Sequence, residues 1–358
     1  MGYINSFLRR DKNPSHDTLS SLLLSYQLAE QMLKEIGGSA EQRIKEPYLA
    51  EKDVAEWRHH INNTLQAKMF EHYFKPKVHD AEKLPEDGAL LVSNHSGMWA
   101  VDVAAANYAL TKETGRPVSG IVHNIFKGSD IRKTLGIIIG NPEHAKEFLQ
   151  DGRLLMVCPG GAEDVAKPFW HRYFVLPFNG FARGNNGYLL LALEAKKPVV
   201  PMAIVGAEET HIHLGNIKPP LDDIVDLVYK NLPQKIQKKT ARFKKIWDSS
   251  TVLPLMLNLF PFPSTIETYV REPIYVHKEL EGFPSRHYMR LRAKNRMGKM
   301  TAAEENEFEE LDEIIYKVNE RVMDSIQDKL NEWRYKGTGK KLVPLTTLAE
   351  PAVKASRA

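Results

Sequence analysis

The chain has 358 residues, with 49 Lys and Arg against 45 Asp and Glu, and a formal net charge of +4. Hydrophobic residues make up 42% and charged residues 26% of the sequence, which excludes a wholly disordered chain. The mean hydropathy of −0.39 argues against a polytopic membrane protein, since no run reaches the roughly 18–20 apolar residues that a spanning helix needs. The single cysteine, Cys158, excludes an internal disulfide and is typical of a reducing compartment. We therefore expect a cytoplasmic protein, peripherally associated with a membrane.

Residues 1–75 are predicted to form an N-terminal helical hairpin. Apolar residues recur at helical spacing over 16–36 and again over 50–74. Gly37 and Gly38 end the first of these helices. Nothing in this region points to chemistry.

Residues 76–280 are predicted to form an α/β core, because short apolar runs alternate there with helical patterns. The runs that favour strands are 89–95, 115–124, 153–161, 197–209 and 264–277, and those that favour helices are 98–112, 143–151 and 184–196. This alternation predicts a mixed, partly parallel sheet flanked by helices, with chemistry at the carboxyl ends of its strands. Residues 281–358 are expected to hold a basic segment, a long C-terminal helix over 303–334 and a loose tail.

The stretch NHSGMWAVD, at 94–102, contains a candidate general base. A histidine between a strand and a helix accepts a proton near neutral pH, and a nearby carboxylate fixes its tautomer. The pattern alone is weak, because the chain has 13 histidines and one at such a junction is more often a cap or a packed side chain. Seven residues of regular helix span about 10 Å. Contact between His95 and Asp102 therefore requires that His95 lie in a loop before the helix.

Paired glycines follow the apolar run at 153–158, in the stretch PGGAED at 159–164. Without side chains, Gly160 and Gly161 let main-chain N–H groups face an oxyanion or a phosphate, although an ordinary turn explains them equally well. A third segment, KPVVPMAIVGAEE, is a buried strand bounded by prolines and is structural by itself.

In their order and spacing, these segments resemble the sequence blocks of the glycerolipid acyltransferase superfamily, which includes lysophosphatidic acid acyltransferases. NHSGMWAVD is similar to the first block, LGIIIGNPEHAKEFLQDGRLLMVCPGGAED to the second and third, and KPVVPMAIVGAEE to the fourth. The resemblance covers roughly residues 75–280. The forms NHSG, PGGAED and VGAEE are most similar to the branch related to monoacylglycerol and diacylglycerol acyltransferases.

This resemblance implies transfer of a fatty acyl group from acyl-CoA to a lipid hydroxyl, with no metal or other cofactor. It implies that His95 removes the hydroxyl proton and that Asp102 orients His95, with Glu163 as the alternative carboxylate. Main-chain N–H groups near the paired glycines are expected to stabilise the oxyanion. Substrate contacts are expected from Asn94, Ser96, Gly97, Gly160, Gly161, Glu163, Arg183 and Glu208.

Two departures from the family pattern affect these expectations. The usual spacing places four residues between the His and the Asp, whereas six separate His95 from Asp102. The usual third block, FPEGTRS, supplies an arginine that suits a phosphate, whereas CPGGAED has acids and no arginine. Two carboxylates repel a phosphate, which favours a neutral alcohol as acceptor, although Lys167 or Arg183 can restore a positive charge.

Residues 228–263 are predicted to face a membrane. Lys and Arg gather over 228–247, and a short apolar run, TVLPLMLNLFPFP, follows. Such a pair suits interfacial binding, with cations at anionic headgroups and apolar side chains at the acyl boundary; a solvated helix followed by a buried loop and strand is the alternative. The basic run 286–299 either joins this surface, binds the CoA phosphates or is a plain solvated helix. No nucleic-acid partner is expected, because the basic runs lack a DNA- or RNA-binding signature.

Three alternative readings remain at this stage. A hydrolase would pass a water proton to His95, and a catalytically silent lipid-binding protein would explain the altered His–Asp spacing. A Ser96 nucleophile is disfavoured, because no G-x-S-x-G elbow surrounds it. His211 and His213 share one face of a strand and can in principle hold a metal, but we predict none, since no further ligand has matching spacing.

Overall fold

The structure is a computed structural model that describes residues 70–97, 100–122, 137–139, 142–175, 186–234, 236–238, 240–241, 244 and 254–334. Most of the predicted N-terminal hairpin and the predicted C-terminal tail lie outside the described residues. The part of the hairpin that is described includes a single short helical segment, η1, at Phe70–Phe74.

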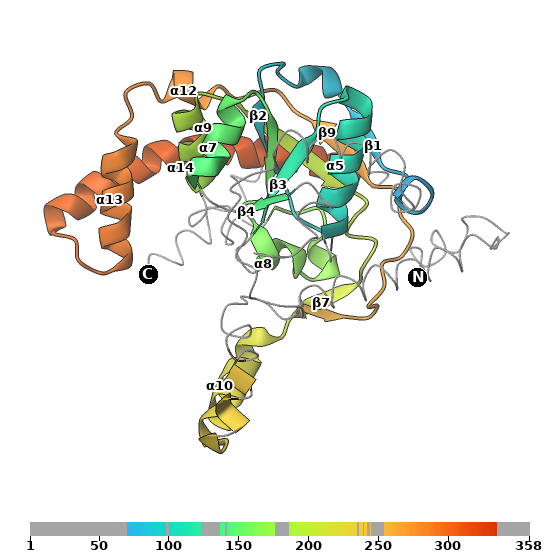
Figure 1. Ribbon diagram of the computed structural model, residues 1–358, viewed down its shortest axis with the longest axis vertical. Coiled ribbons are helices and arrows are strands. Elements are labelled where there is room, and N and C mark those ends of the chain that lie inside the picture. Colours follow the sequence, from blue (N-terminus) through green and yellow to red (C-terminus); the bar gives the residue numbers. More distant parts are fainter. Residues whose placement is uncertain are drawn as a thin grey trace.

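Seven strands form one sheet, in the order β1-β9-β6-β2-β5-β3-β4 (Figure 1). Their bounds are β1 Lys77–His79, β2 Ala89–Ser93, β3 Val118–Val122, β4 Ile137–Ile139, β5 Leu154–Val157, β6 Val199–Val205 and β9 Glu267–Val270. Every neighbouring pair is parallel except β6 and β9, which are antiparallel. The prediction of a mixed, partly parallel sheet is therefore confirmed.

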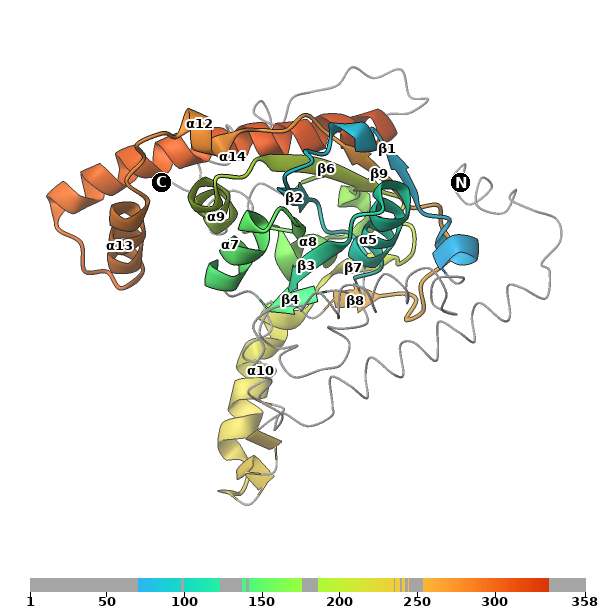
Figure 2. The same cartoon turned by 45° about the horizontal axis from the view of Figure 1, so that its top comes forward.

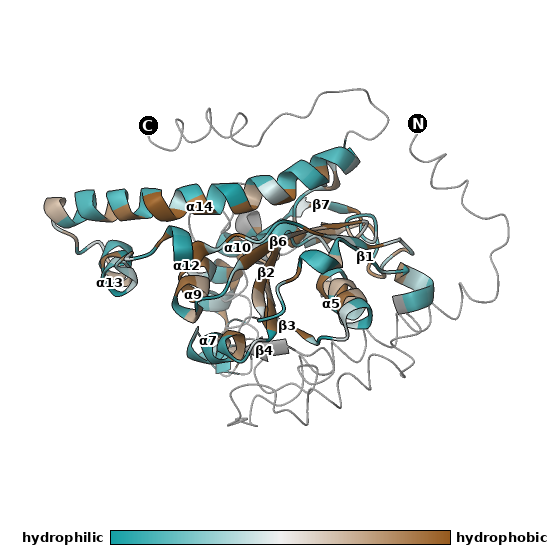
Figure 3. Cartoon of the chain, turned by 90° about the horizontal axis from the view of Figure 1, so that it is seen from above, coloured by the Kyte–Doolittle hydropathy of each residue, from teal (hydrophilic) through white to brown (hydrophobic). Residues whose placement is uncertain are grey.

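Helices cover both faces of this sheet (Figure 2). One face packs against α5 (Val101–Thr114) and η1. The other packs against α7 (Pro142–Gln150), α9 (Gly187–Ala195) and the long C-terminal helix α14 (Ala302–Arg334). Because β2 and β6 lie between two helical layers, every residue in them is buried and they form continuous apolar runs, which Figure 3 shows as brown strands inside the sandwich.

Alternate residues of each central strand enter different cores. In β6, Val200, Met202 and Ile204 join the α5 side, whereas Val199, Ala203 and Val205 join the α14 side. This period of two is the ordinary alternation of an extended chain. It fixes the register of β6, since a slip by one residue would exchange the two cores.

The strand predicted over 264–277 is shorter than expected. β9 ends at Val270, and a short helix, α12 (Val276–Glu279), occupies the end of the predicted range. Pro273 lies between them, and it has no N–H to donate to a sheet ladder. A single antiparallel bridge between Val199 and Ile274 remains beyond it.

The remaining elements lie around the sheet. A two-stranded antiparallel sheet pairs β7 (His213–Asn216) with β8 (Pro254–Met256), and α10 (Lys218–Asn231) projects from this end away from the body (Figure 1). The others are η2 (Ala81–Lys83), α8 (Gly161–Val165), η5 (Phe169–His171) and α13 (Ser285–Arg296). Among the described residues, no helix combines the length and apolar character needed to cross a bilayer.

The pairing of the central strands positions the candidate site. β2 is parallel to β5 on one side and to β6 on the other. The carboxyl ends of the three strands therefore meet at one edge of the sheet, which is where open α/β sheets bind ligands. The stretches NHSG, PGGAED and GAEE each follow one of these strands.

Candidate active site

Asn94 fastens the loop after β2 to the neighbouring strand. Its side-chain N–H donates to the carbonyl of Ile204, 2.9 Å away, and its side-chain oxygen accepts from the N–H of Ile204 at 2.9 Å. The residue is fully buried. The sequence predicted a substrate contact for Asn94, but β6 engages both ends of its carboxamide, so in this structure it anchors the loop that carries His95.

The structure brings His95 and Asp102 into direct contact. His95 Nδ1 lies 2.7 Å from Asp102 Oδ2, and the same oxygen accepts the main-chain N–H of Ser96 at 2.7 Å. His95 is in the loop and Asp102 in the first turn of α5, so the condition set by their six-residue spacing is met. Ala100 enters α5 with a positive φ of 56°, which turns the chain sharply before the helix.

The electrostatics of this pair favour a charged carboxylate and a basic ring. Burial disfavours the ionised form of Asp102, but contact with His95 and the Ser96 N–H outweighs it and lowers the pKa of Asp102. Burial likewise disfavours an imidazolium, yet the Asp102 carboxylate raises the pKa of His95 above 6.5. The imidazole side chain is 19% exposed and the carboxylate fully buried.

Two glycines make room for two carboxylates. A Cβ on Gly97 would lie 2.8 Å from the main-chain N of Asp102 and 3.1 Å from its Oδ1. A Cβ on Gly160 would lie 2.7 Å from Cβ and 2.9 Å from Oδ2 of Asp164. Both were predicted as substrate contacts; here their missing side chains permit the close approach of the acids. The N–H of Gly161 donates to Cys158 O at 3.0 Å and is therefore engaged within the turn. An oxyanion donor among the other main-chain N–H groups near the paired glycines stays a prediction.

A buried network of charges joins the three loops. Asp164 Oδ2 accepts the main-chain N–H of His95 at 2.8 Å, and its Oδ1 lies 2.8 Å from Lys167 Nζ. Lys167 Nζ also lies 2.8 Å from Glu208 Oε1, after β6. Glu208 in turn accepts the main-chain N–H of Tyr173. The sequence proposed Lys167 only as a charge for the acceptor, whereas the structure uses it to bridge two buried acids.

Burial and pairing shift the proton affinities within this network. Burial opposes the charged form of Lys167, but the carboxylates of Asp164 and Glu208 outweigh it and raise its pKa. Burial raises the pKa of Glu208 to about 7, against the opposing effect of Lys167. Lys167 therefore stays charged near neutral pH, while Glu208 titrates there.

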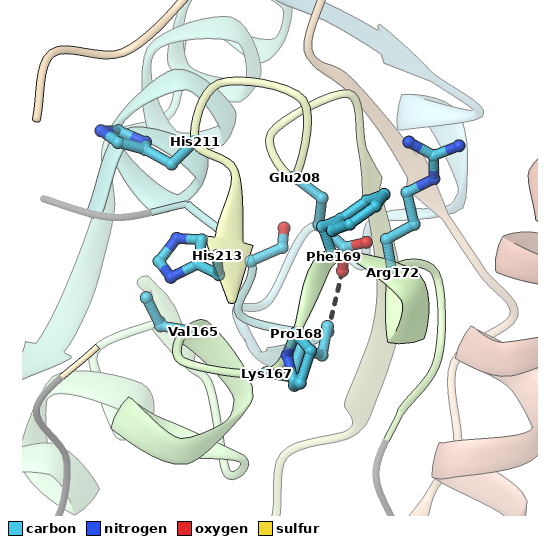
Figure 4. A pocket seen from close by; sticks show the side chains of 9 residues that line it. Val165, Lys167, Pro168, Phe169, Arg172, Glu208, His211 and His213 are labelled. Atoms are coloured by element: carbon cyan, nitrogen blue, oxygen red, sulfur yellow. Dashed lines mark ion pairs between the residues drawn. The ribbon is translucent and has the colours of Figure 1, made fainter. Parts of the chain in front are cut away.

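A small pocket opens beside the network (Figure 4). Ser96, the residue after His95, contributes to it, so the pocket lies next to the candidate base. Its remaining lining consists of Val165, Lys167, Pro168, Phe169, Arg172, Glu208, His211 and His213. The expected contact residues Ser96 and Glu208 are thus brought together.

The other predicted site residues lie elsewhere. Glu163 is exposed on α8. It was the alternative to Asp102 as the carboxylate that orients His95, and in the structure Asp102 contacts the ring. Arg183 lies outside the described residues. In the part of the chain that the structure describes, no group of three or more His, Cys, Asp or Glu side chains is placed to hold a metal ion. Asp164 was missed, although its position three residues before Lys167 is a spacing that pairs charges on a helical turn.

Comparison with known proteins shows which family the core of the chain is similar to. Residues 75–205 match the family model described as "Acyltransferase". Over these residues the chain is similar to the glycerolipid acyltransferase superfamily. An uncharacterized protein of Mycobacterium leprae is 29% identical over 195 residues, which cover 51% of this chain and 51% of that protein. A Bos taurus protein named "DGAT1/2-independent enzyme synthesizing storage lipids" is 27% identical over 146 residues, covering 40% of this chain and 42% of that protein.

Among solved structures, the 1-acyl-sn-glycerophosphate (LPA) acyltransferase from Thermotoga maritima aligns with a TM-score of 0.45 and 13% identity, covering 91% of this chain and 98% of that chain. The chain spans about half the length of the curated relatives it matches. The matched family region holds β2, β5 and β6 and the two loops that carry His95 and Asp164. It ends with the last residue of β6, so Glu208 lies just beyond it.

The charge network predicts that Lys167 is essential for stability. Replacing it in Lys167→Met leaves two buried acids without a cation, which costs about 3–5 kcal/mol of unfolding free energy at pH 8. The loss is expected to shrink as the pH falls from 8 toward about 7, because Glu208 without Lys167 binds a proton at a higher pH than in the wild type. Urea unfolding at pH 8 and near pH 7 measures the free energy of unfolding of both proteins.

The matched control is Lys83→Met, which removes a cation from the exposed Glu272, 3.1 Å away. We expect it to cost no more than about 1 kcal/mol. Equal losses in the two variants would contradict the structural role of Lys167.

Proposed function

We propose that the protein is an O-acyltransferase that moves a fatty acyl group from acyl-CoA to a lipid hydroxyl, with His95 as general base. The observation that carries this proposal is the 2.7 Å contact between His95 Nδ1 and buried Asp102, in a loop at the carboxyl end of the central strand β2. The match of residues 75–205 to the acyltransferase family model supports the reaction class.

The contact assigns the tautomer of His95. An ionised carboxylate only accepts hydrogen bonds, so Nδ1 carries the proton and Nε2 is left as the basic atom. In the proposed reaction, Nε2 takes the proton of the acceptor hydroxyl while its oxygen attacks the thioester carbonyl. The C–O bond forms, the C–S bond then breaks, and the proton passes from the imidazolium to the departing thiolate. Asp102 stabilises the imidazolium between these steps.

The decisive test is His95→Ala in the full chain. We expect acyl transfer from oleoyl-CoA to a panel of neutral and phosphorylated lipid alcohols to fall by about 10³-fold or more, since a general base contributes typically 10²–10⁴-fold and the ring also orders the loop. Mass spectrometry of the products and circular dichroism of the fold provide the measurements. His144→Ala, on α7 and away from the site, is the matched control.

Three outcomes would count against the proposal. Free fatty acid released equally with and without an acceptor indicates a hydrolase. No turnover of acyl-CoA or of an acyl-acyl carrier protein by the wild type indicates a silent lipid-binding protein. Full transfer by the His95 variant removes this ring from the mechanism.

The same pair sets the expected pH dependence. The base must be neutral, so kcat/KM falls as the pH drops through the pKa of His95, which lies above its usual 6.5. Asp102 is the group that raises it. In Asp102→Asn the acidic limb therefore moves to lower pH, while kcat falls at least about 10-fold because the tautomer and the imidazolium lose their support.

We further propose that the protein docks on an anionic bilayer through α10 and the segment after β8. Ile224, Leu227 and Val228 form a stripe at three- and four-residue steps on α10, and each is more than half exposed. Leu255 in β8, and Leu257 and Leu259 after it, stand at every second position and are exposed as well.

The charges of α10 are consistent with this docking. Asp222 lies 2.7 Å from Lys218, and Asp226 lies 2.9 Å from Lys244. Pairing reduces the repulsion that these acids would exert on anionic headgroups. Lys230 and Lys238 are exposed and are available to attract such headgroups.

Substitution of the stripe tests this surface. Leu227→Glu combined with Val228→Glu should lower binding to phosphatidylcholine vesicles containing phosphatidylglycerol by at least about 10-fold, because each buried aliphatic side chain contributes about 1.5–3 kcal/mol. Co-sedimentation measures it. Met297→Glu, equally exposed at the end of α13, should change little. Vesicle binding that changes neither with these substitutions nor with the content of anionic lipid would contradict docking through this face.

A further inference from the structure

The pocket beside His95 contains buried polar groups that the charge network does not use. His213 is 3% exposed and lies on the wall opposite Phe169 and Arg172 in Figure 4. Neither of its ring nitrogens has a hydrogen-bond partner among the described residues. The hydroxyl of Ser96, 2% exposed, is likewise unpartnered within the described structure. Buried polar atoms without partners are uncommon and point to a ligand.

The chemistry of this pocket suits a neutral group. Burial and the nearby Lys167 lower the pKa of His213 to about 4, so its ring is neutral near pH 7 and offers one donor and one acceptor. A hydroxyl group has the same pair of functions. Lys167 is matched by the carboxylates of Asp164 and Glu208. The second cation of the lining, Arg172, interacts electrostatically with Glu209, so an acid offsets each positive charge at the pocket.

The size of the pocket favours the same class of ligand. Its interior takes about one water-sized group, which suits a hydroxyl better than a phosphate. Ser96 joins this space directly to the loop of the candidate base.

We propose that the pocket binds a second, non-reacting hydroxyl of a neutral polyhydroxy acceptor, such as the glycerol backbone of a monoacylglycerol, and that His213 selects for it. This inference rests on the proposed acyl transfer and adds the class of acceptor. His213 is a specificity-determining residue here, because a site built to hydrogen-bond a hydroxyl rejects an analogue that lacks it. Ser96 contributes the second polar contact.

The test compares two acceptors that differ by one hydroxymethyl group. Monooleoylglycerol has the second hydroxyl, and ethylene glycol monooleate has the same chain and ester with a single hydroxyl. We expect the wild type to prefer monooleoylglycerol in kcat/KM by roughly 10- to 100-fold. The other acceptor makes no hydrogen bond to His213 and leaves a buried polar group unpaired. His213→Phe, which keeps a ring and loses both functions, should abolish the preference, chiefly by lowering kcat/KM for monooleoylglycerol.

A conservative variant and a binding measurement keep the test independent of folding. His213→Asn restores a donor and an acceptor and should recover part of the preference. In the wild type, the ¹⁵N ring resonances of His213, assigned by their loss in His213→Asn, should shift on addition of monobutanoylglycerol. Ethylene glycol monobutanoate should shift them much less, and glycerol 3-phosphate should not shift them.

The outcomes separate this inference from the proposed function. Equal use of both acceptors by the wild type, or an unchanged preference in His213→Phe, overturns the subsite while acyl transfer stands. Stronger binding of the phosphorylated compound overturns it too. A selective shift of the His213 resonances without any acyl transfer supports the subsite and overturns the proposed reaction.

Discussion

The carboxylate of Asp164 is the interaction on which the site depends. One oxygen accepts the main-chain N–H of His95, and the other pairs with Lys167, which reaches Glu208. Loops from three different strands are therefore held by one buried acid and one buried cation. An ionised group so far from solvent is stable only while its partners are in place. The position of the candidate base is thus coupled to the charge state of residues that take no part in the proposed chemistry.

The sheet makes this coupling possible. Because β2 is parallel to both β5 and β6, three carboxyl ends lie side by side without long connections across the site. Antiparallel neighbours would have placed two of those ends at the far edge. The close approach of the acids then needs small residues, and Gly97 and Gly160 stand where a Cβ would meet Asp102 and Asp164. Glycines that suggest a ligand-binding turn from the sequence alone can equally provide the room that buried carboxylates need.

The sequence predicted the α/β class and the main helices and strands of the core, because continuous apolar runs and helical periods are local patterns. It also placed the three polar stretches at strand ends. β1 and β4, of three residues each, are too short to be recognised from a local pattern, since they are held by pairing with β9 and β3. The His95–Asp102 contact could be stated only as a condition, because it depends on the left-handed turn at Ala100. This conformation costs about 1–2 kcal/mol for alanine, so the residue type at position 100 does not predict it. Lys167 was identified as a charge, but its two partners lie on separate loops and only the fold brings them together.

The polar pocket and the apolar α10 surface make different demands on one substrate class. A lipid alcohol carries its reactive hydroxyl at one end of a long apolar chain, so an enzyme for it must desolvate the first while leaving the second near a bilayer. η5 packs against β7, and its Phe169 lines the pocket while Trp170 is exposed beside it; aromatic side chains of this kind suit a boundary between water and lipid. β7 also carries His213 and leads into α10. The same short strand therefore connects the hydroxyl-binding wall with the exposed stripe, which places head-group selection within reach of the surface from which the acceptor would come.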